Sequence, residues 1–147
     1  MKKLLFLLIL LGLIFSLFPL SAENAGSIDL LITGLKNDQG EVDIALYNSP
    51  QGFPLDYAKA VKTARVPIKN NEATVNFAGL PEGTYAISLF HDDNLNHQFP
   101  YNFWGKPLKG YGFSDNPPKQ KQAIDFSQAQ FQLGSDPLNL EIKMIYW

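Results

Sequence analysis

Short runs of alternating apolar and polar residues, separated by frequent turns, predict an all-β fold. The number and spacing of the runs fit an antiparallel β-sandwich of about seven strands, of the immunoglobulin-like or transthyretin-like type. The stretch Asp92–Ser114 breaks the pattern, because it is rich in Asp, Asn, aromatic residues and glycine, and it predicts one long loop. The chain has no cysteine, so its core alone must hold the fold together.

The N-terminal segment has the features of a secretory signal peptide. Two lysines precede an apolar run over 4–20, and small residues follow it up to Ala22. We predict a signal peptide over 1–22, with an uncleaved membrane anchor as the alternative because the run approaches the roughly 18 residues that a span needs. The remaining 23–147 are then a single exported domain, periplasmic or extracellular, with no membrane span.

The charge of the chain excludes two classes of partner. The whole sequence has 12 basic and 14 acidic side chains, for a formal charge of −2. Without 1–22, which contain two lysines and no acid, 10 basic and 14 acidic side chains remain, for a charge of −4. Nucleic acids and anionic lipids require a clustered basic face, so we expect neither as a partner.

The first two strands are predicted on either side of a hairpin turn. Residues 27–35 alternate with their apolar side chains on one face, and 42–47 alternate in the same way. Gly40 lies in the turn between them and can take the positive φ that hairpin turns require. The pair predicts an antiparallel sheet with one face in water.

Three further strands are predicted in the middle of the chain, over 63–68, 73–77 and 84–90. The first of them should lie at a sheet edge, because Pro67 has no N–H to donate to a neighbouring strand. Before it, 55–62 predict one or two helical turns. The strand over 84–90 leads directly into the long loop.

The last part of the chain predicts a short helical turn and two strands. Asp125 can cap a turn over 125–129, and 130–133 resume extended structure. The final strand has the clearest alternation of the chain, with its apolar side chains on one face: Leu138, Leu140, Ile142, Met144 and Tyr146.

The long loop begins with oxygen-bearing side chains at a spacing typical of calcium loops. Asp92 opens the pattern D-x-N-x-N, which lets a tightly turning loop direct three oxygens toward one hard cation. The second half of the full motif is missing. We therefore predict a degenerate Ca²⁺ site, with Asp92, Asn94, Asn96 and Asn102 as ligands. The alternative is a metal-free loop whose Asx side chains cap their own turns.

Two other kinds of chemistry stay open for this region. His91 and His97, together with the loop aspartates, can form a transition-metal site. A hydrolase can use the same carboxylates and histidines, or a histidine–aspartate pair with Ser114. The sequence contains no G-x-S-x-G, no H-E-x-x-H and no phosphate-binding glycine loop. We therefore predict that the protein is not an enzyme and keep the hydrolase as an alternative.

Aromatic residues are concentrated in the second half of the loop: Phe99, Tyr101, Phe103, Trp104, Tyr111 and Phe113. Rings at the end of a sandwich can stack on a sugar or on apolar side chains of a partner. The alternative is a loop packed by its own rings. We predict a binding or structural module in which Tyr101, Trp104 and Tyr111 bind the ligand, an envelope glycan or protein.

Four motifs, taken in order, resemble those of the domain of unknown function 2141 family. They lie at Gly40–Pro54, Phe77–Ala86, His91–Asn96 and Gly105–Ser114. The resemblance implies a small exported bacterial protein and no particular activity. The turn Leu80-Pro81-Glu82-Gly83-Thr84-Tyr85 also resembles one in collagen-adhesin B-type and carboxypeptidase regulatory-like sandwiches, which implies fold rather than function.

The resemblance also bears on the calcium prediction. The family's usual loop resembles H-D-x-N-x-N-G, followed by an acidic residue and then Asn. The four predicted ligands match this pattern, but His97 stands where glycine is usual and Pro100 where the acidic residue is usual. The resemblance therefore implies that this chain binds calcium weakly or not at all.

Overall fold

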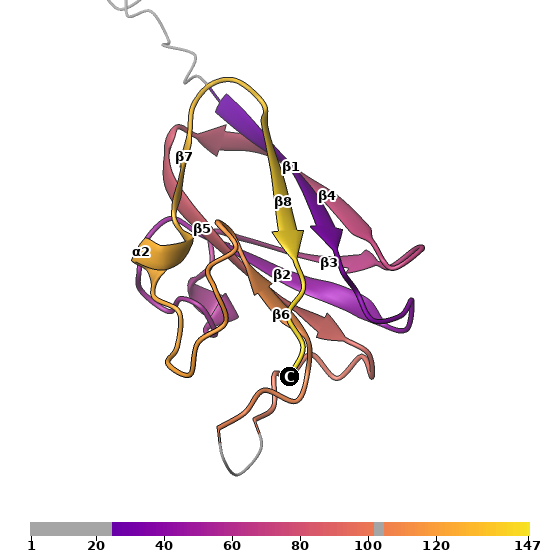
Figure 1. Cartoon of the computed structure of the whole chain (residues 1–147). Helices are drawn as coiled ribbons and strands as arrows, with labels where there is room; N and C mark the ends of the chain where they lie inside the picture. The colour runs from indigo at the N-terminus through magenta and orange to yellow at the C-terminus, as the bar shows by residue number, and fades with distance from the viewer. Residues whose placement is uncertain (1–24, 102–104) are drawn as a thin grey trace, which may run out of the picture.

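The computed structural model describes residues 25–101 and 105–147, so the predicted signal peptide over 1–22 lies outside them. The described residues form two facing sheets (Figure 1). The first sheet has the order β4-β1-β8, made of β4 (Ala73–Pro81), β1 (Ala25–Thr33) and β8 (Leu138–Lys143). The second has the order β3-β2-β5-β6, made of β3 (Lys62–Pro67), β2 (Glu41–Tyr47), β5 (Gly83–Asp92) and β6 (Tyr111–Phe113), and β7 (Phe131–Leu133) also pairs with β5. The predicted all-β sandwich is confirmed.

Three features of the strands differ from the prediction. The predicted hairpin pair of β1 and β2 is wrong, because the two strands lie in different sheets: β1 pairs with β4 and β8, and β2 pairs with β3 and β5. Among the described residues there are eight strands rather than about seven, because β6 lies inside the stretch predicted as one loop. A three-residue strand with Gly112 at its centre has no alternation that sequence could show. In addition, β8 pairs with β1 in parallel, whereas the other named strand pairs are antiparallel.

The short helices and the edge strand lie where the sequence predicts them. The 3-10 helix η2 (Tyr57–Lys59) is capped by Asp56, whose side chain accepts from the Ala58 N–H at 3.2 Å. The helix α2 (Phe126–Ala129) follows Asp125. β3, which contains Pro67, is an edge strand of its sheet. In the described part of the chain, no helix has the length and apolar character needed to cross a membrane.

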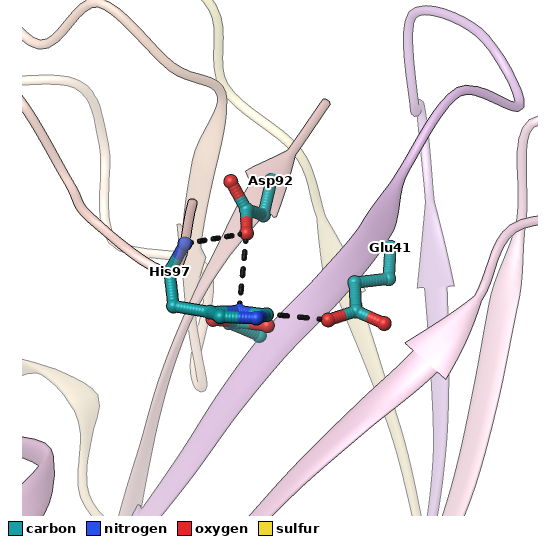
Figure 2. A group of neighbouring side chains, drawn as sticks. Glu41, Asp92 and His97 are labelled. Carbon is teal, nitrogen blue, oxygen red and sulfur yellow. Dashed lines mark hydrogen bonds and ion pairs between the residues drawn. The ribbon is translucent and has the colours of Figure 1, made fainter. Parts of the chain in front are cut away.

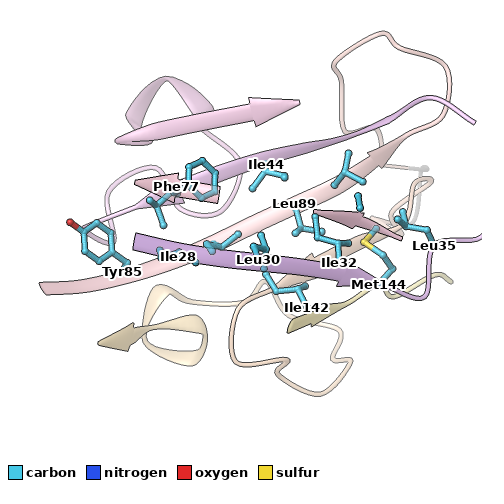
Figure 3. Close-up of a cluster of buried hydrophobic side chains, with 14 of the residues drawn as sticks. Ile28, Leu30, Ile32, Leu35, Ile44, Phe77, Tyr85, Leu89, Ile142 and Met144 are labelled. Carbon is cyan, nitrogen blue, oxygen red and sulfur yellow. The ribbon is translucent and has the colours of Figure 1, made fainter. Parts of the chain in front are cut away.

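The main core fills the space between the two sheets (Figure 3). It contains the predicted apolar face of β1, where Ile28, Leu30 and Ile32 are all buried. β2 contributes Leu46, and β8 contributes Ile142, both with no exposed surface. Each such aliphatic side chain contributes about 1.5–3 kcal/mol when it is fully buried, which is how a chain without disulfides remains folded.

The second sheet is also buried on its outer face, and the predicted water-exposed face of β2 is therefore wrong. Every residue of β2 from Val42 to Tyr47 is buried. α2 packs against β5, and the neighbouring side chains complete a second apolar cluster: Ala45, Tyr47, Ala86, Ile124, Phe126 and Ala129. The alternating pattern of β2 could not show this cover, because the residues that supply it lie about 80 positions later. One consequence is that the polar residues on this face, including Asp43 and Asp92, are buried.

Replacement of Leu46 by alanine should destabilise the fold by about 2–5 kcal/mol, since it leaves a cavity in a fully buried site. The matched control is Leu108→Ala, because Leu108 is 62% exposed and its loss should change stability by less than about 0.5 kcal/mol. Urea unfolding followed by circular dichroism measures both. Equal effects of the two substitutions would contradict the described core.

Candidate functional site

The beginning of the long loop wraps around the ammonium group of Lys109. Nζ donates to Oδ1 of Asn94 at 2.9 Å and to Oδ1 of Asn96 at 2.6 Å, and it also donates to Oδ1 of Asp92. The lysine side chain is only 5% exposed, and that of Asp92 is not exposed at all. Three of the four predicted calcium ligands therefore converge as expected, but they converge on a lysine. The fourth, Asn102, lies outside the described residues.

The loop curls because two of its residues adopt the left-handed backbone conformation. Leu95 and His97 both have φ of 55°, and they alternate with the two asparagines. A non-glycine residue pays roughly 1–2 kcal/mol for this conformation. Oδ2 of Asp92 accepts from the His97 N–H at 2.8 Å and holds the curl in place. Glycine adopts this conformation without a steric penalty, so His97 carries strain that a glycine at this position would avoid.

The same contacts control the protonation of Asp92. Burial acts to raise the pKa of this carboxyl, but the hydrogen bonds from the Lys109 ammonium and the His97 N–H outweigh it, and the pKa is lowered from its ordinary value. The carboxylate is thus ionised at neutral pH, and with Lys109 it forms a buried ion pair. Such a pair persists because the remaining ammonium hydrogens also have acceptors.

Two acidic residues that the sequence analysis missed complete this site. Glu41 lies directly opposite Asp92 in the β2–β5 register, and Asp43 lies two residues further along the same face of β2. Both approach the ring of His97, whose Nδ1 is 3.2 Å from Oδ2 of Asp43 and 3.6 Å from Oε1 of Glu41. Nδ1 is also 3.2 Å from Oδ2 of Asp92 (Figure 2). Desolvation is the largest effect on Asp43, and it raises the pKa of this carboxyl.

Strand register is what brings these acids to the loop. An acidic pair two positions apart was visible in β2, but only the pairing of β2 with β5 shows that both face Asp92. β3 adds Arg65, which pairs with Asp43 and whose Nε lies 3.5 Å from Oδ1 of that residue. The outer face of the sheet therefore holds three carboxylates at its loop end.

The other histidine and Ser114 take no part in this cluster. The ring nitrogens of His91 lie 2.8 Å from the hydroxyl of Tyr146 and 2.7 Å from the carbonyl oxygen of Gln39. The Ser114 hydroxyl accepts from the Ile87 N–H at 2.8 Å and donates to the carbonyl of Ala129. These groups thus fix the fold locally. Hydrolysis by the loop carboxylates and histidines stays the alternative to the predicted absence of enzymatic activity.

A groove with a volume of about 760 Å³ lies beside the loop. Its aromatic lining is Phe99, Tyr101, Tyr111, Phe113 and Trp147. Tyr101 and Tyr111 were predicted as ligand-binding residues, whereas the predicted Trp104 lies outside the described residues. Trp147 was missed, because a residue at the end of a strand pattern carries no signal of where its ring lies. We call this feature the aromatic groove.

The rings of the aromatic groove are connected to the Lys109 site. The Lys109 ammonium lies 5.5 Å from the ring centroid of Phe90, and that ring lies 5.5 Å from the ring of Phe99. Phe99 in turn meets Tyr101 edge-on at 5.2 Å and Tyr111 at 6.1 Å. The loop is therefore packed partly by its own rings, and Tyr101 remains 45% exposed.

Lysines give the aromatic groove a positive character. The Nζ atoms of Lys119 and Lys106 lie 3.8 Å and 5.4 Å from the ring centroid of Trp147, and Lys121 also lines the groove. The indole N–H of Trp147 donates to the Tyr111 hydroxyl at 2.9 Å, which fixes the ring. Among the described residues that line the groove, none is acidic.

The chain is similar to one bacterial protein family and, more distantly, to solved adhesin structures. Residues 30–141 match a family described as an uncharacterized protein conserved in bacteria, DUF2141. No curated protein matches the chain significantly. A solved pilus-presented adhesin, Spy0125 (Cpa), is 17% identical, with a TM-score of 0.27, and the match covers 87% of this chain and 28% of the adhesin. A mutant form of that adhesin is 16% identical, with a TM-score of 0.24 and coverage of 86% and 28%.

Replacement of Lys109 by methionine should destabilise the protein by about 3–5 kcal/mol, because it leaves the buried Asp92 carboxylate without its cation. Unfolding in urea at neutral pH measures the loss. The control is Lys69→Met, since Lys69 is exposed and the change should cost less than about 0.5 kcal/mol.

The lowered pKa of Asp92 makes the stability of the protein depend on pH. Its contribution to stability is complete above its ordinary pKa of about 3.9 and is lost as pH falls through the lower folded value, so the acid-side slope should weaken in Lys109→Met. A Lys109→Met variant as stable as the wild type would contradict the ion pair.

Calcium should leave the melting temperature of the wild-type protein unchanged, because the Lys109 ammonium already occupies the oxygens that would bind the ion. Thermal unfolding in chelator and in millimolar calcium tests this. A rise specific to calcium would show that the ion displaces the ammonium. This measurement also tests the sequence-based expectation of calcium binding by Asp92, Asn94, Asn96 and Asn102.

Proposed function

The chain belongs to the DUF2141 family of bacterial proteins, and we propose that it is an exported binding module whose aromatic groove takes an acidic glycan. The observation that carries the proposal is the composition of the groove, which combines five aromatic rings and three lysines with no acidic side chain among its described lining residues. Export rests on the N-terminal sequence, with its basic start and apolar run.

The rings provide the surface on which a sugar can bind. Tyr101 and Trp147 are each 45% exposed, although aromatic side chains of this size are usually well covered. The apolar face of a pyranose packs against such rings, and their polar edges can bond to hydroxyl groups. Gln120 and Gln122 line the same groove and add amide donors and acceptors. The volume of about 760 Å³ lies within the range of about 300–1,000 Å³ that small-ligand sites occupy.

The lysines select for negative charge on the ligand. They gather in one groove of a chain whose net charge is −2, so the local potential there is opposite to that of the whole protein. Lys119 also donates to the carbonyl of Tyr146 at 3.1 Å, which holds its ammonium close to the Trp147 ring. A uronic acid or a phosphorylated sugar presents both an apolar ring face and an anion, and it matches rings and lysines together.

The Lys109 site supports the groove structurally. The ammonium holds the beginning of the loop, and the packing of Phe90 against Phe99 carries that rigidity to the ring of Tyr101. Preorganised rings lose less conformational entropy when a ligand binds. The module therefore needs the buried ion pair for shape and the exposed rings for contact.

Acidic oligosaccharides should bind saturably in isothermal titration calorimetry, and neutral oligosaccharides of the same length should bind more weakly. Tyr101→Ala should cost about 2 kcal/mol, or about 30-fold in Kd, since it removes an exposed stacking ring. Lys119→Met should weaken acidic ligands selectively, and salt should reduce the difference between acidic and neutral ligands.

Leu108→Ala is the control for the glycan experiment, because this exposed side chain is outside the groove lining. Its binding should equal that of the wild type. The proposal fails if no acidic oligosaccharide binds, or if binding is unchanged in Tyr101→Ala and in Trp147→Ala. Saturable binding of a protein segment instead, lost in the same variants, would assign the groove to a protein partner.

A further inference from the structure

Three carboxylates converge on one nitrogen of an imidazole ring at the loop end of the second sheet. Nδ1 of His97 has oxygens of Asp43 and Asp92 at 3.2 Å and an oxygen of Glu41 at 3.6 Å. One atom from each of the four side chains lies within 4.8 Å of the others. The residues come from β2, from the end of β5 and from the loop, so three separate segments meet here (Figure 2).

The cluster holds more negative charge than its fixed cations neutralise. Like charges placed side by side across a strand pair are destabilising. The Lys109 ammonium pairs with Oδ1 of Asp92, and Arg65 lies 3.5 Å from Asp43 and 3.9 Å from Glu41. Two cations against three carboxylates leave one net negative charge. A further cation among the four side chains would remove it.

Asp43 provides a second observation that points to a ligand. Its side chain is only 5% exposed, with Oδ2 directed at the His97 ring and Oδ1 3.5 Å from the Nε of Arg65. No donor in the described part of the chain makes a hydrogen bond to its Oδ1. A buried carboxylate oxygen without a donor is costly. Among the described residues Oδ1 is held only by the long contact to Arg65, so the carboxylate keeps capacity for a closer cation.

The distances favour a metal ion over a proton on the ring. A single imidazolium N–H can point at only one acceptor, and charge-assisted bonds of that kind are about 2.7–2.9 Å long. Here the nitrogen is nearly equidistant from three oxygens, at 3.2, 3.2 and 3.6 Å. Ligands bound to zinc at about 2.0–2.2 Å in a tetrahedron are separated from each other by about 3.3–3.6 Å. The three distances from Nδ1 to the oxygens are close to the edges of that tetrahedron.

We propose that His97 Nδ1 and the carboxylates of Glu41, Asp43 and Asp92 form a binding site for a divalent transition-metal ion, with Zn²⁺ as the best match. One nitrogen and three oxygens suit zinc, whereas calcium prefers six to eight oxygens at longer distances. This ligand set differs from the predicted calcium site, since it uses the opposite oxygen of Asp92 and faces away from Lys109.

The proposed metal site is accessible from solvent, and a bound ion would stiffen the loop. The side chains of His97 and Glu41 are 38% and 24% exposed, so an ion can reach the cluster from solvent. Metal bonds would join β2 to β5 and both to the loop. This loop carries Phe99 and Tyr101 of the aromatic groove, so the metal would stiffen one wall of the groove without taking part in ligand contact.

The test is zinc binding by the full chain, purified without a histidine tag and stripped with chelator. We expect one zinc ion per chain in isothermal titration calorimetry, a higher melting temperature with zinc, and no competition by calcium. His97→Asn should weaken zinc by about 100-fold or more, since second-shell changes alone cost 10–100-fold. Asparagine tolerates the left-handed conformation of this residue, so the loop should keep its shape. Asp43→Asn should weaken zinc similarly.

One variant serves as the control. Asp93→Asn removes the exposed neighbouring carboxylate and should bind zinc as the wild type does. Cobalt(II) gives a second readout, because a tetrahedral site produces a visible absorption band that should disappear in His97→Asn. The proposal is overturned if no saturable zinc binding occurs, if calcium displaces zinc at equal concentration, or if His97→Asn and Asp43→Asn both bind zinc unchanged.

Discussion

The buried ion pair between Lys109 and Asp92 shapes the functional end of this protein. An ammonium taken out of water needs acceptors for all its hydrogens, and Asp92, Asn94 and Asn96 provide them. The chain can reach that arrangement only by curling, with Leu95 and His97 in the left-handed conformation. The hydrogen bonds to the Lys109 ammonium thus offset the cost of desolvating the ion pair and of straining the backbone.

Cover on the outer face of the second sheet makes this ion pair possible. Helix α2 and the residues around it bury one part of that face. Toward the other end of the same strands, the loop covers Asp43 and Asp92. Polar side chains that would be ordinary surface groups on an open sheet are thereby placed in a medium of low polarity. Their mutual interactions become stronger there, and so does the penalty for any group that lacks a partner.

The aromatic groove and the carboxylate cluster belong to the same end of the sandwich and have opposite charge. The groove gathers lysines around Trp147, whereas the cluster gathers acids around His97. The loop separates them, and Phe90 and Phe99 form the contact between them. The opposite charges of the two regions would let the proposed anion and the proposed metal ion bind without competing for the same residues.

The sequence by itself determined the sandwich, because apolar residues that face the core alternate with polar residues along β1 and β8. It also determined that Asp92, Asn94 and Asn96 direct oxygens to one point, since a spacing of two is a local property. Only the tertiary structure decided what lies at that point. Lys109 is 13 residues beyond Asn96 and arrives there through β6 pairing with β5. Glu41 and Asp43 reach His97 through strand register, and Trp147 reaches the groove from the chain's end. Contacts between distant segments leave no periodicity in the sequence, so no local pattern could predict them.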